Sequence, residues 1–415
     1  MGAQEGKVFI LIVWRKKNMK RFASVFAMIV AMMMLAACFA GCAAQGGDDQ
    51  PGSDASTQPE QPGESTPAAD DGEEIVIGGI GPLTGGAASY GISVKQGGQL
   101  AVDEINAAGG INGKQIKYLF EDDESDAEKA LSAYSKLMDE GMQVLMGTVT
   151  SDPCIAVTDE SSKDGILQIT PSGSAEACAQ YDNCFRICFT DPLQGRSMAN
   201  YMYEEDVRKV AVIYDVSSDY SSGIYEAFVD EFEALGGTVV AAESFTSGDV
   251  DFKTQLTKIK ATDAEALFLP IYYTEVAYIS NQAVNVGLKL PYYGCDGWDG
   301  VIAQLEGDTT NIEGAVYLTP FVANSEDEAV QKFVADYKAK FGADPDQFAA
   351  DAYDAIYTIK AAIEKAGSMD NDAIIAAMTE ITVPGITGEM TFTKEGEPNK
   401  AARVAVIKDG QYIGK

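Results

Sequence analysis

Short apolar runs alternate with amphipathic segments over most of the sequence, and this alternation limits the chain to a small set of folds. The first series has strand-like runs at 75–80, 115–120, 144–146 and 166–169 and helical segments at 93–107, 126–139 and 153–163. Continuous apolar strands that alternate with amphipathic helices indicate a parallel sheet covered on both faces. We therefore expect one doubly wound α/β unit here.

A second series of the same kind follows. Its strands are predicted at 210–214, 238–241, 266–269, 291–294 and 314–318, and its helices at 222–235, 252–260 and 275–286, with further helices at 327–341, 347–366 and 371–378. A chain of 415 residues also exceeds what one core usually holds. The sequence thus predicts an α/β fold with two doubly wound parallel-sheet lobes.

The charge balance and the missing histidine exclude several function classes. The chain has 63 Asp and Glu against 30 Lys and Arg, and such a surface repels phosphate backbones and anionic lipid headgroups. We expect no nucleic-acid binding, and any membrane attachment must come from something other than charge. Histidine is absent, which removes Ser-His-Asp and Cys-His catalysis and HExxH zinc sites.

Residues 19–42 have the order of an export signal. Lys20 and Arg21 precede an apolar stretch at 22–35, and small residues then lead to a cysteine. The stretch is shorter than the roughly 20 residues of a membrane span. The run LAAC at 35–38 resembles the bacterial lipobox, so we expect a signal peptide at 1–37 and a lipid on Cys38, with Cys42 as the alternative. Met19 also fits a natural start, which would make 1–18 a gene-model extension.

A segment rich in Gly, Pro, Ser, Gln and acidic residues follows the cysteines and extends to residue 73. It has almost no large apolar side chains, so burial cannot offset the entropy of ordering it. We expect residues 38–73 to be a flexible, lipid-anchored acidic linker. The body would then lie outside the cell, on the outer face of the cytoplasmic membrane.

Cysteine spacing in the body leaves two interpretations open. Cys154, Cys178, Cys184, Cys188 and Cys295 are an odd set, so at least one thiol is unpaired. Cys178, Cys184 and Cys188 are close enough in sequence for one local disulfide, and buried free thiols fit equally well. No spacing suggests a metal site.

In open α/β sheets, ligands bind beyond the carboxyl ends of the strands. Segment 147–153 (GTVTSDP) and segment 170–174 (TPSGS) place hydroxyls and backbone N–H groups at two strand ends of the first lobe. Such donors suit an anion such as a carboxylate, although plain helix capping also explains them. The glycine-rich loop at 81–91 lacks the spacing of a dinucleotide motif, so no cofactor is expected.

The second lobe has acids and aromatic residues at three strand ends, in segments 215–220 (DVSSDY), 272–275 (YYTE) and 295–299 (CDGWD). An ammonium group prefers a carboxylate partner and can rest on aromatic faces. Donors in one lobe and acids in the other together fit an α-amino acid, although ordinary packing also explains each aromatic residue.

At these motifs the sequence resembles the branched-chain amino-acid-binding proteins of ABC importers, which have the type I periplasmic binding protein fold. The resemblance covers the chain from 75 to about 408. It is carried by the order and spacing of IVIGGIGPLTGGAASYG (75–91), AVDEINAAGGINGKQI (101–116), the Ser151 loop, GILQITPSGSAEA (165–177), FRICFTDPLQG (185–195), KVAVIYDVSSDYSSG (209–223) and GITGEMTF (385–392).

The resemblance implies a role for each of several residues. The Ser151 hydroxyl, the backbone at Ser172 and the hydroxyl and N–H of Ser174 would hold the ligand carboxylate. Asp296 would pair with the ammonium group beside Tyr272. The residues implied to line the side-chain pocket are Tyr90 and Tyr220.

Two residues depart from the family pattern. Leucine and isoleucine binders of this family usually have Thr and Glu where this chain has Ser174 and Asp296, and Asp is one methylene shorter than Glu. The shape of the pocket is therefore open, and leucine, isoleucine, valine, alanine or an amide-type solute are all candidates.

The resemblance also implies three crossovers between the lobes, near 186–191, 319–321 and 397–404. The expected lobes are then 74–190 with 320–403, and 191–319 with 404–415. Closure about this hinge would exclude water and strengthen the contacts to the ligand.

The sequence therefore predicts a monomeric, exported binding protein that is not an enzyme. It would capture a small amino acid and deliver it to the membrane subunits of an ABC importer. A sensor of the same fold that reports to a signalling partner is the alternative.

Overall fold

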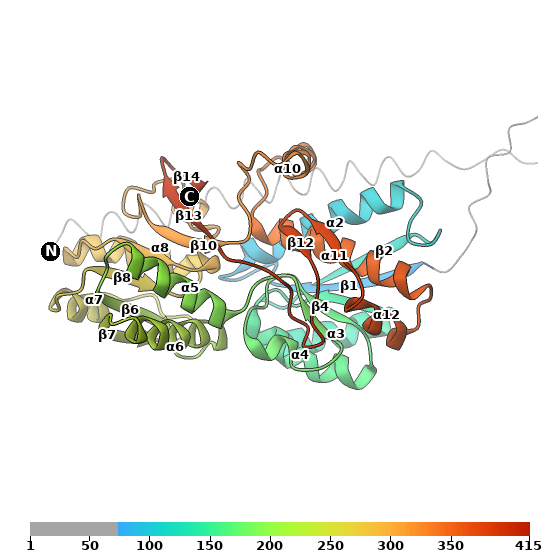
Figure 1. Ribbon diagram of the computed structural model, residues 1–415, viewed down its shortest axis with the longest axis horizontal. Helices are drawn as coiled ribbons and strands as arrows, with labels where there is room; N and C mark the ends of the chain where they lie inside the picture. Colours follow the sequence, from blue (N-terminus) through green and yellow to red (C-terminus); the bar gives the residue numbers. More distant parts are fainter. Residues whose placement is uncertain (1–73) are drawn as a thin grey trace, which may run out of the picture. The chain divides into compact units, whose positions relative to one another are not determined.

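Two sheets of mainly parallel strands organise residues 74–415, the part of the chain that this computed structural model describes (Figure 1). The expected signal segment at 1–37, the lipidation candidates Cys38 and Cys42 and the rest of the linker to residue 73 lie outside the described residues.

The first sheet has the strand order β2-β1-β3-β4-β5, and all of its strand pairs are parallel. Its strands are β1 (Ile75–Gly81), β2 (Ile116–Asp122), β3 (Val144–Gly147), β4 (Gln168–Thr170) and β5 (Cys184–Arg186). The helices between them are α2 (Ala88–Ala107), α3 (Ala127–Asp139) and α4 (Ser151–Asp164), with a short 3-10 turn η2 (Glu176–Ala179) before β5. Helix α2 lies on one side of this sheet and α3 and α4 lie on the other (Figure 1), where side chains including Leu137, Leu145 and Val157 form a separate buried cluster.

The second sheet has the order β14-β13-β10-β9-β8-β6-β7. Its strands are β6 (Lys209–Asp215), β7 (Thr238–Phe245), β8 (Ala266–Leu269), β9 (Tyr292–Gly294), β10 (Val316–Thr319), β13 (Arg403–Lys408) and β14 (Gln411–Gly414). Pairs from β7 to β10 are parallel, and β13 is antiparallel to both β10 and β14. Its helices are α5 (Asp191–Glu204), α6 (Asp219–Ala234), α7 (Lys253–Lys260), α8 (Tyr273–Val286) and α9 (Val301–Gln304), with a 3-10 turn η3 (Asp296–Trp298) after β9.

The chain passes between the two sheets three times, after β5, after β10 and before β13. The segment between the second and third passages returns to the first sheet, where α11 packs along α2. Its elements are α10 (Glu328–Phe341), α11 (Gln347–Ala366), α12 (Asn371–Met378) and the two-stranded ribbon β11 (Val383–Gly385) and β12 (Gly388–Met390). We call the five-stranded sheet with its helices lobe 1 and the seven-stranded sheet with its helices lobe 2.

The α/β fold with two parallel sheets is as the alternation of apolar runs predicts. The boundaries differ in a few places, because local features hide them. Helix α2 begins at Ala88, five residues before the predicted start, since its glycines weaken the apolar periodicity. The strands β5 and β11 to β14 and the helices α5 and α9 have no counterpart in the prediction. Short strands give little periodicity unless a clear apolar run marks them, as it does for β3 and β4.

All five cysteines of the described residues are free and buried, so the interpretation as buried thiols is correct for Cys178, Cys184 and Cys188. No helix among residues 74–415 combines the length and the apolar character that crossing a membrane requires.

The contact between α2 and α11 depends on a glycine. A Cβ atom on Gly97 would lie 2.0 Å from the carbonyl oxygen of Ala349, so the two helix backbones meet with no room for a side chain.

We predict that Gly97→Ala lowers the free energy of unfolding by about 1–3 kcal/mol, the usual cost of overpacking, measured by urea unfolding. Gly86→Ala is the matched control, because a Cβ atom there meets nothing within 4 Å. Equal stability of both variants would contradict the prediction.

Candidate functional site

The residues predicted to bind a ligand follow strands at the points where each sheet reverses its winding. In lobe 1 the order reverses between β1 and β3, and in lobe 2 between β6 and β8. Loops that leave the carboxyl ends of such strands part to opposite faces and leave a crevice between them. Tyr90 and Ser151 follow the first pair of strands, and Tyr220 and Tyr272 follow the second pair.

A loop of serines in lobe 1 presents hydrogen-bond donors. Ser151 opens α4, and its Oγ accepts hydrogen bonds from the backbone N–H groups of Ser174 and Ala175, both at 3.2 Å. With its lone pairs occupied, this hydroxyl has a proton left to donate. Ser172 donates its own hydroxyl to the carbonyl of Val149 at 2.7 Å, which leaves only its backbone groups for a ligand.

Arg186, the last residue of β5, holds this serine loop from behind. It is fully buried, and its guanidinium group donates to three carbonyl oxygens, those of Gly173, Ala175 and Glu176, at 2.9–3.0 Å. Its Nε lies 3.1 Å from the Glu397 carboxylate, which precedes the third passage between the lobes. Arg186 thus fixes the carbonyls of the loop, while the N–H groups of Ser174 and Ala175 converge on Ser151 Oγ.

Lobe 2 contributes a carboxylate surrounded by tyrosines. Asp296 is 5% exposed, and its Oδ1 accepts a hydrogen bond of 2.6 Å from the Tyr220 hydroxyl. The ring of Tyr220 stacks on that of Tyr272, with centroids 4.7 Å apart. Burial raises the pKa of Asp296 to about 6, although the hydrogen bond from Tyr220 opposes the rise.

Tyr90 and the first residues of α11, which belong to lobe 1, contact residues of lobe 2. The Tyr90 hydroxyl donates to the carbonyl of Gly297 at 2.5 Å, and its ring stacks on Phe348 at 4.0 Å. The Gln347 side chain donates to the carbonyl of Asp296 at 2.6 Å. The lobes thus contact each other directly around Asp296.

Two buried polar atoms at this place lack a hydrogen-bond partner among the described residues, Ser174 Oγ and Asp191 Oδ2. The two residues are neighbours, because the Asp191 N–H donates to the Ser174 carbonyl at 3.0 Å. Burial raises the pKa of Asp191 well above its usual range, and the negative charge of Asp296 adds to the rise. The Ser174 hydroxyl lies near enough to the Asp191 carboxylate to oppose the rise, but the two atoms form no hydrogen bond of normal geometry. Buried polar atoms without partners are costly, so these two fit contacts to a ligand.

The arrangement suits a small zwitterion. The serine loop offers donors backed by a buried guanidinium group, and Asp296 and Asp191 offer negative charge beside aromatic rings. No cluster of three or more metal-ligating side chains occurs within residues 74–415.

All the residues singled out from the sequence lie in these two groups. Ser151, Ser172 and Ser174 share one loop system, and Tyr220, Tyr272 and Asp296 share the other. Tyr90 lies against the second group, with its ring 5.5 Å from that of Tyr272. None of them falls elsewhere in the fold.

Sequence reasoning missed Asp191, Gln347 and Phe348, all of which begin or lie near the start of a helix. Asp191 follows β5, a strand that the sequence does not predict, so it is not among the residues expected just after a strand. Its position after Arg186 on the first passage between the lobes was the available signal. Phe348 gave none, because it resembles any apolar residue of an amphipathic helix.

Comparison with known proteins decides the family. The sequence profile described as "Periplasmic binding protein" matches residues 74–411. The chain belongs to this family. Such proteins bind solutes outside the cytoplasm, so this chain is an exported solute-binding protein.

Several relatives are similar over nearly their whole length. The Leu/Ile/Val-binding protein homolog 3 of Brucella melitensis is 32% identical over 347 residues, which cover 82% of this chain and 93% of the relative. The leucine-, isoleucine-, valine-, threonine- and alanine-binding protein of Pseudomonas aeruginosa is 30% identical over 329 residues, which cover 78% of this chain and 87% of the relative. Among solved structures, LivJ of Streptococcus pneumoniae in complex with isoleucine has a TM-score of 0.77 at 31% identity, covering 83% of this chain and all of that one.

We predict that Arg186→Lys lowers the free energy of unfolding by about 2–4 kcal/mol, because one ammonium group cannot reach three carbonyls and a carboxylate. Urea unfolding measures the loss. Arg196→Lys, at an exposed position of α5, is the control and should stay within about 0.5 kcal/mol of the unmodified protein. If both variants unfold alike, Arg186 does not anchor the loop.

Proposed function

We propose that this periplasmic binding protein captures a small amino acid, branched-chain or similarly aliphatic, between its lobes and delivers it to an ABC importer. The observation that supports this is the pairing of a donor loop in lobe 1 with a buried acidic and aromatic group in lobe 2. Relatives named for binding leucine, isoleucine and valine support the same ligand class.

The ligand carboxylate binds the serine loop. Its contacts are the Ser151 hydroxyl, the backbone at Ser172 and the N–H and hydroxyl of Ser174. The Ser174 N–H, which donates to Ser151 Oγ in this structure, turns to the ligand instead. The Arg186 charge behind the loop strengthens this interaction, because it acts through a dry interior.

The ligand ammonium group binds between Asp296 and Asp191. An ammonium group has three N–H donors and needs several acceptors. Asp296 is one methylene shorter than the glutamate usual in related binders, and the unpartnered oxygen of Asp191 supplies a further acceptor. Tyr272 lies beside the ammonium group, and Tyr90, Tyr220 and Phe348 surround the side chain.

The protein carries out no chemical step. Residues 74–190 with 320–403 and residues 191–319 with 404–415 close on the ligand about the three passages of the chain. The importer recognises the closed form. A lipid on Cys38, or on Cys42, holds the monomer at the outer face of the cytoplasmic membrane through the linker that ends at residue 73.

We predict that leucine, isoleucine, valine or alanine changes the fluorescence of Trp298 and raises the melting temperature. Trp298 is buried two residues from Asp296, and it is the one tryptophan of the described residues. Asp296→Asn should weaken binding by about 3–5 kcal/mol, because it removes the partner of a buried ammonium group. Calorimetric titration measures this loss.

Asp308→Asn is the control, because Asp308 is exposed on the same lobe. Binding by Asp296→Asn within tenfold of the unmodified protein would remove Asp296 from the site. If all twenty amino acids leave fluorescence and melting temperature unchanged, the ligand class is wrong.

We also predict that amino-acid affinity rises with pH through the pKa of Asp296, which burial raises to about 6. A bound ammonium group favours the carboxylate form, so binding below pH 6 releases a proton and becomes weaker, approaching about tenfold per pH unit. Titration at pH 5.5 in buffers of different ionisation enthalpy measures the release. An affinity that is constant from pH 5 to 7 would contradict the ion pair.

A further inference from the structure

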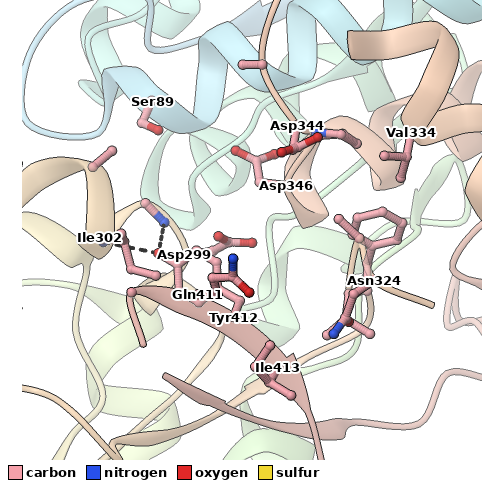
Figure 2. Close-up of a pocket in the computed structure, with 18 of the residues that line it drawn as sticks. Ser89, Asp299, Ile302, Asn324, Val334, Asp344, Asp346, Gln411, Tyr412 and Ile413 are labelled. Atoms are coloured by element: carbon pink, nitrogen blue, oxygen red, sulfur yellow. Dashed lines mark hydrogen bonds between the residues drawn. The ribbon is translucent and has the colours of Figure 1, made fainter. Parts of the chain in front are cut away.

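A cavity of about 800 Å³ lies beside the candidate amino-acid site, with walls from both lobes. Ser89 and Asp346 enter it from lobe 1, and Asp299 and Tyr412 enter it from lobe 2 (Figure 2). Its size is that of an ordinary small-molecule pocket. The neighbouring residue of Ser89 is Tyr90, so the two sites share a wall.

The charged groups of this cavity are all acidic. Asp299, Asp344 and Asp346 line it, and no Lys or Arg is among its lining residues. Asp344 is exposed and pairs with Lys338 at 2.8 Å, whereas Asp299 and Asp346 form no ion pair among the described residues. The cavity therefore has one carboxyl group without a cationic partner on each lobe.

The two carboxylates differ in how their oxygens are used. Asp346 caps α11 and accepts hydrogen bonds from the Ala349 N–H and the Ser93 hydroxyl. Asp299 is 5% exposed, and its Oδ2 accepts the Gln347 N–H at 3.1 Å. Burial raises the pKa of both carboxyl groups, and the negative charge of Asp346 adds to the rise for Asp299. A bound cation would remove this repulsion.

A tyrosine gives an independent indication of a ligand. Tyr317 lines the cavity and is 1% exposed. Its hydroxyl forms no hydrogen bond with the described residues and remains accessible from the cavity. Its ring meets that of Tyr412 edge-on at 5.4 Å. The Tyr412 hydroxyl accepts the N–H groups of Gly300 and Ile302, so both rings are held at the cavity wall. Phenol oxygens and aromatic faces both attract ammonium groups.

We propose that this cavity is a second binding site, for an aliphatic diamine or polyamine held by Asp299 and Asp346 with Tyr317 as a further acceptor. Two carboxylates suit two ammonium groups, and the aromatic rings suit the methylene chain between them. Because the carboxylates come from opposite lobes, the amine binds the closed form and stabilises it.

Gln347 links the two sites. Its N–H contacts Asp299, and its side-chain amide contacts the carbonyl of Asp296 at 2.6 Å. An amine that fixes Asp299 also fixes this contact to the amino-acid site. The two ligands should therefore raise each other's affinity by the same factor.

The test is titration of the purified protein with 1,4-diaminobutane at constant ionic strength, followed by melting temperature and calorimetry. The expected result is saturable stabilisation in the millimolar range or below. Asp299→Asn should weaken diamine binding by about tenfold or more, and Tyr317→Phe should weaken it less. Asp263→Asn is the matched control, because its carboxylate is exposed, already pairs with Lys209 and lies outside the cavity, and it should bind nearly as the unmodified protein does.

Three results would overturn the proposal: no stabilisation by 10 mM diamine, about the same diamine affinity in Asp299→Asn as in the unmodified protein, or equal stabilisation by calcium chloride, which would mean a site for inorganic cations. Amino-acid binding is measured on the same samples without the amine. A protein that binds the diamine but no amino acid would reject only the amino-acid assignment, and the reverse result would reject only the second site.

Discussion

Parallel strands release the chain at one edge of a sheet, and the position of each candidate ligand contact in this protein depends on that geometry. In lobe 1 the loops after β1, β3 and β4 leave the same edge, which brings Ser151 against Ser174. In lobe 2 the loops after β6, β8 and β9 do the same for Tyr220 and Asp296. Since each loop starts from a buried strand, the functional side chains are placed by the cores of the two lobes.

Charged groups of opposite sign lie on the two sides of the candidate site. The buried Arg186 charge lies behind the serine loop and fixes its carbonyls, and Ser151 Oγ, which accepts two of the loop's N–H groups, keeps its own proton for an anion. Asp296 and Asp191 form no ion pair among the described residues, and burial raises their pKa values. A zwitterion would place its carboxylate at the serine loop and its ammonium group at the carboxyl groups. Each of its charges would then meet the opposite charge in an environment of low dielectric constant.

Contacts between the lobes are made by residues beside the candidate site and the acidic cavity. Tyr90 reaches the backbone of Gly297, and Gln347 reaches both Asp296 and Asp299. The proposed closure would therefore use the same side chains as the proposed ligand contacts. The start of α11 cannot shift toward one carboxylate without changing its contact with the other, which is the physical basis for the proposed coupling between the two sites.

The sequence by itself determined the fold class, and it predicted an export signal and most of the candidate ligand contacts. Apolar periodicity is local, and residues directly after a strand, such as Ser151, Tyr220 and Asp296, can be located from it. Only the tertiary structure revealed Asp191, Phe348 and the cavity around Asp299 and Asp346. Asp299 and Asp346 are 47 residues apart in the sequence and lie in different lobes. Their proximity results from the packing of the lobes and the return of the chain to lobe 1, and no local pattern records such long-range contacts.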